Sequence, residues 1–305
     1  MLLKQNLRLH RILRMTWRVD MIMLISCAAA HYVDIRWLGD VNIPAALPAL
    51  MGTAIAFFIG FNNNQAYDRW WEARIIWGAL VNDSRSWARG LLAYCAAPAE
   101  SSLNAEDIAR YQRTLIRRHI AFVYALKGAL RRRDVNAFEK YLSPEEAERV
   151  KTFSNIPNAI LDLQGHDLQK LSKENVIDGF RFRILDELLR NFCDNMGKSE
   201  RINNTVFPTT YIYFTRLFIW MFVILTTMSI AHAVGHWSIL LGFMVGFVFH
   251  ITHINGMNIM DPFQHNPAGI PVNSITRTIE INLLQALQEK DIPQPEAPIK
   301  GEYIL

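Results

Sequence analysis

The sequence contains few cysteines, and none of them falls in a recognisable motif. The three cysteines, Cys27, Cys95 and Cys193, lie far apart, and no CxxC pair occurs. A disulfide framework and a zinc site both need cysteines grouped at short spacings. We therefore expect neither a disulfide-stapled domain nor a bound metal.

The sequence also lacks the short motifs of common nucleotide-binding and hydrolytic enzymes. No Walker loop, GxGxxG, GxSxG or HExxH pattern occurs, so we expect neither an enzyme nor a cofactor. The 28 acidic residues nearly match the 32 basic ones, which argues against a nucleic-acid partner. Hydrophobic residues make up 51% of the chain, which excludes a disordered protein.

Two long stretches carry no charge. No Asp, Glu, Lys or Arg occurs between Val41 and Tyr67, or between Leu217 and Met260. A helix that crosses the hydrocarbon core needs about 20 residues, so the second stretch holds two helices, separated at Gly235-His236. A weaker apolar segment between Trp17 and Trp37 adds another helix. The predicted spans are residues 18–38, 44–64, 209–233 and 237–258.

Basic residues dominate the start of the chain, where no acid occurs before Asp20. The positive-inside rule places this end in the cytoplasm, and four spans return the C-terminus to the same side. The predicted organisation is a cytoplasmic N-terminal segment (1–17), spans one and two (18–64), a cytoplasmic helical domain (65–205), spans three and four (206–260), and a cytoplasmic C-terminal segment and tail (261–305).

Helix signals fill the 65–205 segment, and no alternating strand pattern is present. Ala105-Glu106-Asp107 begins one helix, and Ser143-Pro144-Glu145-Glu146 begins another with a cap, a proline and acids in the expected order. Apolar residues recur at helical spacing from Phe180 to Phe192. We therefore predict an all-α membrane protein with four transmembrane helices and a large cytoplasmic helical domain.

The second span carries one bulky stripe. Thr53, Phe57 and Phe61 recur every four residues, which places them on one helix face. Their neighbours are small, as suits closely packed membrane helices. Identical helices ringed around an axis would stack such a stripe into a hydrophobic constriction that gates by dewetting. The alternative interpretation is that both phenylalanines are ordinary packing residues.

Histidines near the last spans suggest a different class of protein. His236 and His250 are separated by a spacing that some membrane b-type cytochromes use to bind haem, with His31 or His232 as the partner on another span. The simpler interpretation is histidines at helix interfaces. A membrane assembly protein without transport is a further alternative. His250, His253 and Met257 also share a helix face, as they would in a site for a soft metal. The histidines and the methionine near the last span are His232, His236, His250, His253, Met257 and His265.

The residues after the second span carry a family resemblance. Residues 60–85 read GFNNNQAYDRWWEARIIWGALVNDSR, and they resemble the bestrophin family of ion channels in its bacterial and plant form. The dense charged and aromatic cluster within this stretch also predicts a fixed bend between membrane and cytoplasmic domain. The positions that match the family signature along the chain are Gly60, Asp68, Arg69, Trp70, Trp71, Glu72, Arg74, Pro208, Pro262 and Phe263.

The resemblance implies a homopentamer in the inner membrane, with one pore that passes small monovalent ions along the fivefold axis. Thr53, Phe57 and Phe61 then form the pore neck, and Phe180 forms a second, cytoplasmic constriction. Animal members conduct anions, whereas bacterial relatives can conduct cations, so the sign of the permeant ion stays open.

The resemblance also includes a departure. Animal members follow Asn-Pro-Phe with a run of acids that clasps calcium, whereas residues 261–269 here read DPFQHNPAG, with Asp261 as the single acid. Calcium needs several oxygen ligands, usually including carboxylates. We therefore expect no calcium activation through this loop.

Overall fold

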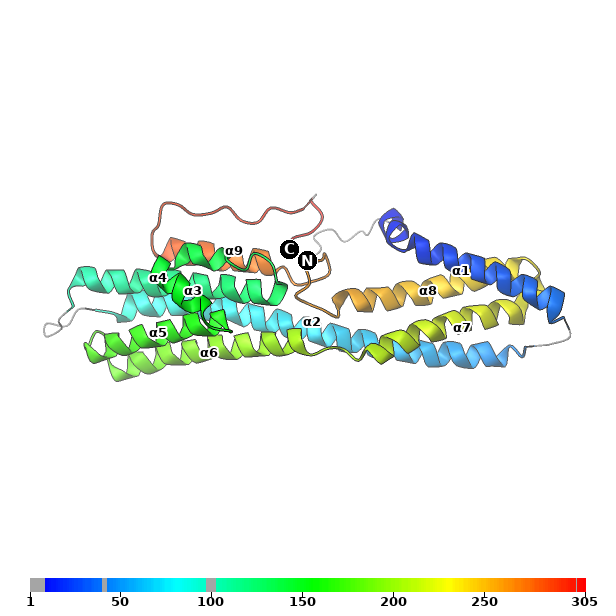
Figure 1. Cartoon of the computed structure of the whole chain (residues 1–305), viewed down its shortest axis with the longest axis horizontal. Coiled ribbons are helices and arrows are strands. Elements are labelled where there is room, and N and C mark those ends of the chain that lie inside the picture. The colour runs from blue at the N-terminus through cyan, green and yellow to red at the C-terminus, as the bar shows by residue number, and fades with distance from the viewer. Residues whose placement is uncertain (1–8, 40–42, 97–102, 300) are drawn as a thin grey trace. The chain divides into compact units, whose positions relative to one another are not determined.

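Almost every ordered element of the protein is a helix. The computed structural model describes residues 9–39, 43–96, 103–299 and 301–305, with the backbone alone for residues 9–13 and 15. No strand occurs in these ranges, and one isolated bridge joins Ile299 to Tyr303. The elements, in chain order (Figure 1), are α1 (Leu9–Trp37), α2 (Ala46–Tyr94), α3 (Ala105–Arg131), the 3₁₀ helix η1 (Ala137–Tyr141), α4 (Pro144–Lys151), α5 (Ile156–Lys173), α6 (Gly179–Asn204), α7 (Thr209–Val234), α8 (Trp237–Ile259) and α9 (Val272–Ala286).

Local sequence signals account for several helix ends. Asn104 caps α3 and Ser143 caps α4, each in a capping box with the acid three residues later, as the sequence predicted for α4. Gly235, with φ of 60°, ends α7 and allows α8 to begin two residues later, at the predicted break. Each of these signals acts within one helical turn, so the position of the helix end does not depend on contacts with distant residues.

The chain divides into two compact units, and α2 contributes to both. Among the described residues, the four-helix unit comprises residues 9–70 and 206–261, and the insert unit comprises residues 71–205 and 262–305. The expected bend at the Asp-Arg-Trp-Trp-Glu cluster is not present as a helix break, because α2 continues through it for 49 residues. No proline lies between Pro48 and Tyr94 to interrupt its backbone hydrogen bonds.

In the four-helix unit, α1, α7 and α8 pack together, and the first half of α2 packs on α7. The shared core includes Met23, Ile59 and Phe222. Glycine permits close approach: a Cβ on Gly242 of α8 would lie 2.0 Å from the Thr227 Oγ1 of α7. By length and composition, α2, α7 and α8 could cross a membrane.

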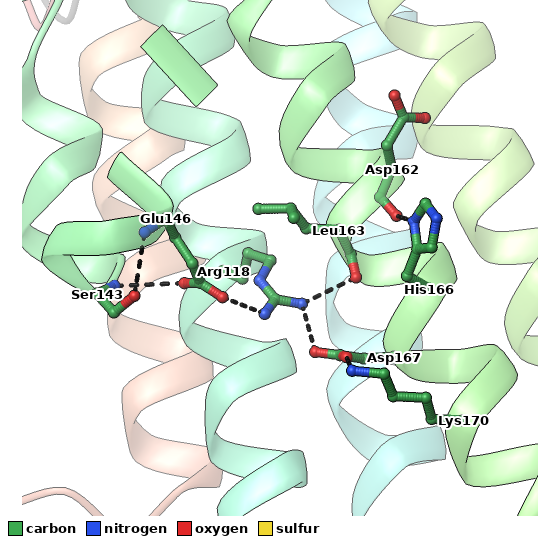
Figure 2. A network of polar contacts seen from close by, with 8 residues as sticks. All are labelled: Arg118, Ser143, Glu146, Asp162, Leu163, His166, Asp167 and Lys170. Carbon is green, nitrogen blue, oxygen red and sulfur yellow. Dashed lines mark hydrogen bonds and ion pairs between the residues drawn. The ribbon is translucent and has the colours of Figure 1, made fainter. Parts of the chain in front are cut away.

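The insert unit is built around α3, in which all of residues 118–128 are buried. α5, α6, η1 and α9 pack on it. Arg118 of α3 is 3% exposed and binds two acids, Glu146 of α4 and Asp167 of α5, as Figure 2 shows. This network ties three helices together through one buried cation.

Candidate functional site: an exposed stripe on α2

The predicted neck residues share one exposed face of α2. Thr53 is exposed, Phe57 is 66% exposed and Phe61 is 62% exposed, whereas the opposite face of the same helix is buried. The two phenyl rings are 6.1 Å apart between centroids. They line a shallow surface depression of about 390 Å³ together with Ala56, Gly60 and Asn64.

The opposite face of α2 explains why the stripe points outward. Ile55 and Ile59 are each 2% exposed and belong to the core with α1 and α7. A Cβ on Gly52 would lie 2.9 Å from the Phe222 ring, so this part of α2 sits close against α7. Burial of one face therefore fixes the rotation of the helix, and with it the direction of Phe57 and Phe61.

Three consecutive asparagines follow the aromatic pair: two bond to neighbouring helices and one is exposed. The Asn62 Nδ2 donates to Thr215 Oγ1 at 3.4 Å, and the Asn63 Nδ2 donates to the Thr252 carbonyl oxygen at 3.2 Å. Asn64 is exposed on the same side as the phenyl rings. The sequence prediction missed Asn64, although helical periodicity alone would have placed it beside Phe57 and Phe61.

The signature cluster continues α2 without interruption. Trp70 stacks on Tyr67, with ring centroids 6.1 Å apart, and Trp71 is 49% exposed. The Glu72 carboxylate of this cluster binds Arg201 of α6 at 2.5 Å. No local spacing pointed to Arg201, which is remote in sequence.

Phe180, the predicted second constriction, begins α6. Its side chain is 83% exposed, the most exposed of the large apolar side chains described. Asp178 caps the helix by accepting a hydrogen bond from the Arg181 backbone N–H at 2.8 Å. The cap fixes the first turn, so Phe180 projects from a defined position and not from a loose loop.

The loop after α8 contains the last signature residues, Pro262 and Phe263. Phe263 is fully buried, with its ring 6.4 Å from that of Trp77. The Arg131 guanidinium donates to the Phe263 carbonyl oxygen at 3.1 Å and to the Ile270 carbonyl oxygen at 2.9 Å. A fixed cation therefore engages two backbone carbonyl oxygens of this loop. Pro208, the remaining signature proline, directly precedes α7.

His265 in the same loop reports this positive environment. Burial lowers the pKa of His265, and the neighbouring guanidinium groups of Arg131 and Arg133 lower it further.

Two of the histidines considered as haem ligands, His31 and His236, contact each other in the four-helix unit. The His31 Nδ1 is 2.9 Å from Ser238 Oγ, and its Nε2 is 3.0 Å from His236 Nδ1. Both ring nitrogens of His31 are therefore engaged, and neither is turned toward a haem iron. Across the described ranges, no group of three or more His, Cys, Asp or Glu residues is arranged to hold a metal.

Comparison with known proteins identifies the family. A family model described as bacterial/fungal bestrophin protein matches residues 4–285. A voltage-dependent anion channel-forming protein from Salmonella typhi is 29% identical over 284 residues, which cover 93% of this chain and 90% of that protein. One of the same name from a Nostoc species is 27% identical over 264 residues, which cover 85% and 84%.

Solved structures agree on the fold. A bacterial bestrophin homologue from Klebsiella pneumoniae superimposes with a TM-score of 0.81 at 24% identity, over 89% of this chain and 98% of that one. The family match spans the α2 stripe, the signature cluster and both prolines that precede or follow spans. The chain belongs to the bacterial and fungal bestrophin family.

Proposed function

We propose that this chain is the subunit of a bestrophin-type channel, a homopentamer that conducts small monovalent ions passively through a central pore. One observation carries the proposal: Thr53, Phe57 and Phe61 form an exposed stripe on a helix whose opposite face is tightly packed. Exposed apolar side chains on a membrane-spanning helix face either lipid or another subunit, and we assign this stripe to the subunit axis because it carries the residues that match the family's neck.

The stripe suits a gate. Five copies of α2 around an axis would turn it into stacked rings, two of them aromatic, with the more polar Thr53 ring at one end. A narrow apolar constriction excludes water until the helices separate, which closes the pore to ions without any covalent step. The small Ala56 and Gly60 beside the phenylalanines leave room for neighbouring helices.

The four-helix unit provides the membrane part. α2, α7 and α8 are apolar enough to span, and we assign α1 as the fourth span. Its acids are turned inward: the Thr16 hydroxyl donates to Asp20 at 2.5 Å, and His232 lies 3.3 Å from Asp34. Buried and partnered acids are the arrangement that a bilayer tolerates.

The remaining assignments follow from this one. Residues 18–64 and 206–260 lie in the inner membrane, and residues 1–17, 65–205 and 261–305 lie in the cytoplasm. Phe180 forms a second constriction on the cytoplasmic side. The channel needs no cofactor and is not activated by calcium through the Asp261 loop.

We propose that the permeant species is a small monovalent ion, and the observations bear differently on the sign of its charge. The names of the similar bacterial proteins favour anions. The aromatic rings by themselves permit either sign, because the edge of a phenyl ring attracts anions and its face attracts cations.

The test is the reversal potential and open probability of the purified protein in a planar bilayer under a KCl gradient. Phe57→Ala should raise the open probability, because it removes an apolar ring from the neck. Phe58→Ala is the matched control: Phe58 is the adjacent residue, 43% exposed, but its ring packs near that of Phe218 on another face of α2. It should leave gating unchanged.

The assembly is checked first by light scattering, where a pentamer of the 35.1 kDa chain has a mass of about 175 kDa. Absence of ion flux from well-assembled wild-type protein and from Phe57→Ala would refute the channel. Equal effects of Phe57→Ala and Phe58→Ala would refute the neck assignment.

A further inference from the structure

The exposed stripe of α2 does not end at Phe61. With about 3.6 residues per turn, Asn64 and Asp68 lie within about 20° of Phe57 around the helix axis, closer than Thr53 or Phe61. Both side chains are exposed, and Asn64 lines the same depression as the two phenyl rings. The face therefore changes from apolar to amide to carboxylate along one line.

The packed neighbours confirm this rotation. Asn62, Asn63 and Ala66 point toward the other helices of the unit: the two amides bond to α7 and α8, and Ala66 is fully buried. A Cβ on Gly256 would lie 1.8 Å from Asn63 Oδ1, so α8 holds that amide closely. The residues between and just after these positions are exposed, and of these Asn64 and Asp68 share the angular position of Phe57.

The charge of Asp68 is not compensated on this face. Arg69 and Arg74, the basic residues of the cluster, lie roughly 100–120° away from Phe57 around the axis. Within the described part of the chain Asp68 has no ion-pair partner, in contrast to Glu72, which binds Arg201 at 2.5 Å. Within the described residues, the Asp68 carboxylate is therefore not neutralised by an ion pair.

We propose that Asn64 and Asp68 continue the pore lining below the aromatic neck, and that Asp68 is a charge-selectivity residue that favours cations over anions. The inference rests on the proposed function, in which α2 lines a fivefold pore. Each subunit then adds one carboxylate to a ring about 10 Å along the axis from the Phe61 ring. Five like charges at a narrow passage raise the local concentration of cations and oppose anions.

This effect has one direction whatever ion the wild-type channel prefers. Removal of the carboxylate must shift the permeability ratio toward chloride, in a cation channel by weakening its preference and in an anion channel by strengthening it. The shift should also shrink in concentrated salt, because the Debye length falls from about 10 Å at 0.1 M to about 3 Å at 1 M.

The experiment measures reversal potentials of the reconstituted pentamer under a KCl gradient. Asp68→Asn should lower the ratio of potassium to chloride permeability about threefold or more at 0.1 M salt. Asp68→Lys should lower it further, and Asp68→Glu should restore the wild-type ratio. Asp68→Ser supplies a second neutral side chain if the Asn variant does not assemble. Glu145→Gln, which removes an exposed carboxylate from α4, is the control and should shift nothing.

Two results distinguish the role of Asp68 from the proposed pore lining by α2. If Asp68→Asn and Asp68→Lys keep the wild-type reversal potential while Phe57→Ala still raises the open probability, the α2 pore stands and the role of Asp68 is overturned. If Phe57→Ala also changes nothing, α2 does not line the pore, and both proposals are overturned together.

Discussion

Replacement of Arg118 by methionine should destabilise the insert unit severely. Methionine keeps much of the length and apolar character of the side chain and removes the guanidinium. Glu146 and Asp167 would then face each other across α4 and α5 with no cation between them, and the Leu163 carbonyl oxygen would lose a donor that lies 3.1 Å away (Figure 2).

The size of the effect follows from burial. The Arg118 side chain is 4% exposed, and its two acidic partners are 22% and 15% exposed. Breaking a buried ion pair by removing one partner costs about 3–5 kcal/mol, because a charge is left buried without compensation. Lys170 remains 3.3 Å from Asp167, so the uncompensated charge is mainly that of Glu146. For a folding unit of this size, each kcal/mol shifts the melting temperature by about 2–4 °C, so the expected loss is about 6–20 °C.

The assay is tryptophan fluorescence during thermal unfolding of the purified protein, with Arg110→Met as the control. Arg110 also lies on α3 and also binds an acid, Asp107 at 2.7 Å, but its side chain is 74% exposed. Such a surface pair contributes about 1 kcal/mol or less. Glu146→Gln and Asp167→Asn, added to Arg118→Met, should recover part of the loss by removing the stranded charges. An Arg118→Met protein that melts within about 2 °C of wild type would refute the reasoning.

Three further predictions concern pH, helix packing and calcium. Burial lowers the pKa of His119 to about 3, so the folded protein keeps this imidazole neutral, whereas the unfolded chain protonates it below about pH 6.5. The free energy of unfolding should therefore fall by about 1.4 kcal/mol for each pH unit between about pH 6.5 and pH 3. The His119→Gln variant should melt with a flatter pH profile. An unchanged profile would count against a neutral buried His119. Gly242→Ala should cost about 1–3 kcal/mol, because its Cβ would lie 2.0 Å from Thr227 Oγ1, and adding Thr227→Ala should recover part of that in a thermal melt; a Gly242→Ala protein as stable as wild type would contradict the close approach. Micromolar calcium should not change the bilayer current, because Arg131 occupies the loop carbonyls; a calcium response that Asp261→Ala abolishes would overturn this expectation.

Much of the fold could be predicted from the sequence. The predicted spans 209–233 and 237–258 match α7 and α8 to within one residue at each end. The cap at Ser143 and the break at Gly235 lie where they were expected. These signals are local or compositional: an uncharged run, a cap within one turn, a glycine that tolerates positive φ. They act before any distant contact forms.

The candidate site was predictable only in part. The spacing of Thr53, Phe57 and Phe61 put them on one face, but spacing does not say whether that face is buried or exposed. Packing of Ile55 and Ile59 against α1 and α7 decided it. The uninterrupted course of α2 was mispredicted, because the charged and aromatic cluster suggested an interface and not a continuous helix.

The sequence by itself determined where the helices lie, because apolar runs and caps depend on neighbours within a few residues. Only the tertiary structure decided which way each helix faces and which distant charges meet. Asn62, Asn63 and Asn64 are chemically identical, and only contact with α7 and α8 distinguishes two structural amides from one exposed amide. Likewise Glu72 binds Arg201, and Arg118 binds Glu146 and Asp167, because folding brings separate helices together. Such pairs depend on geometry that no short window of sequence contains.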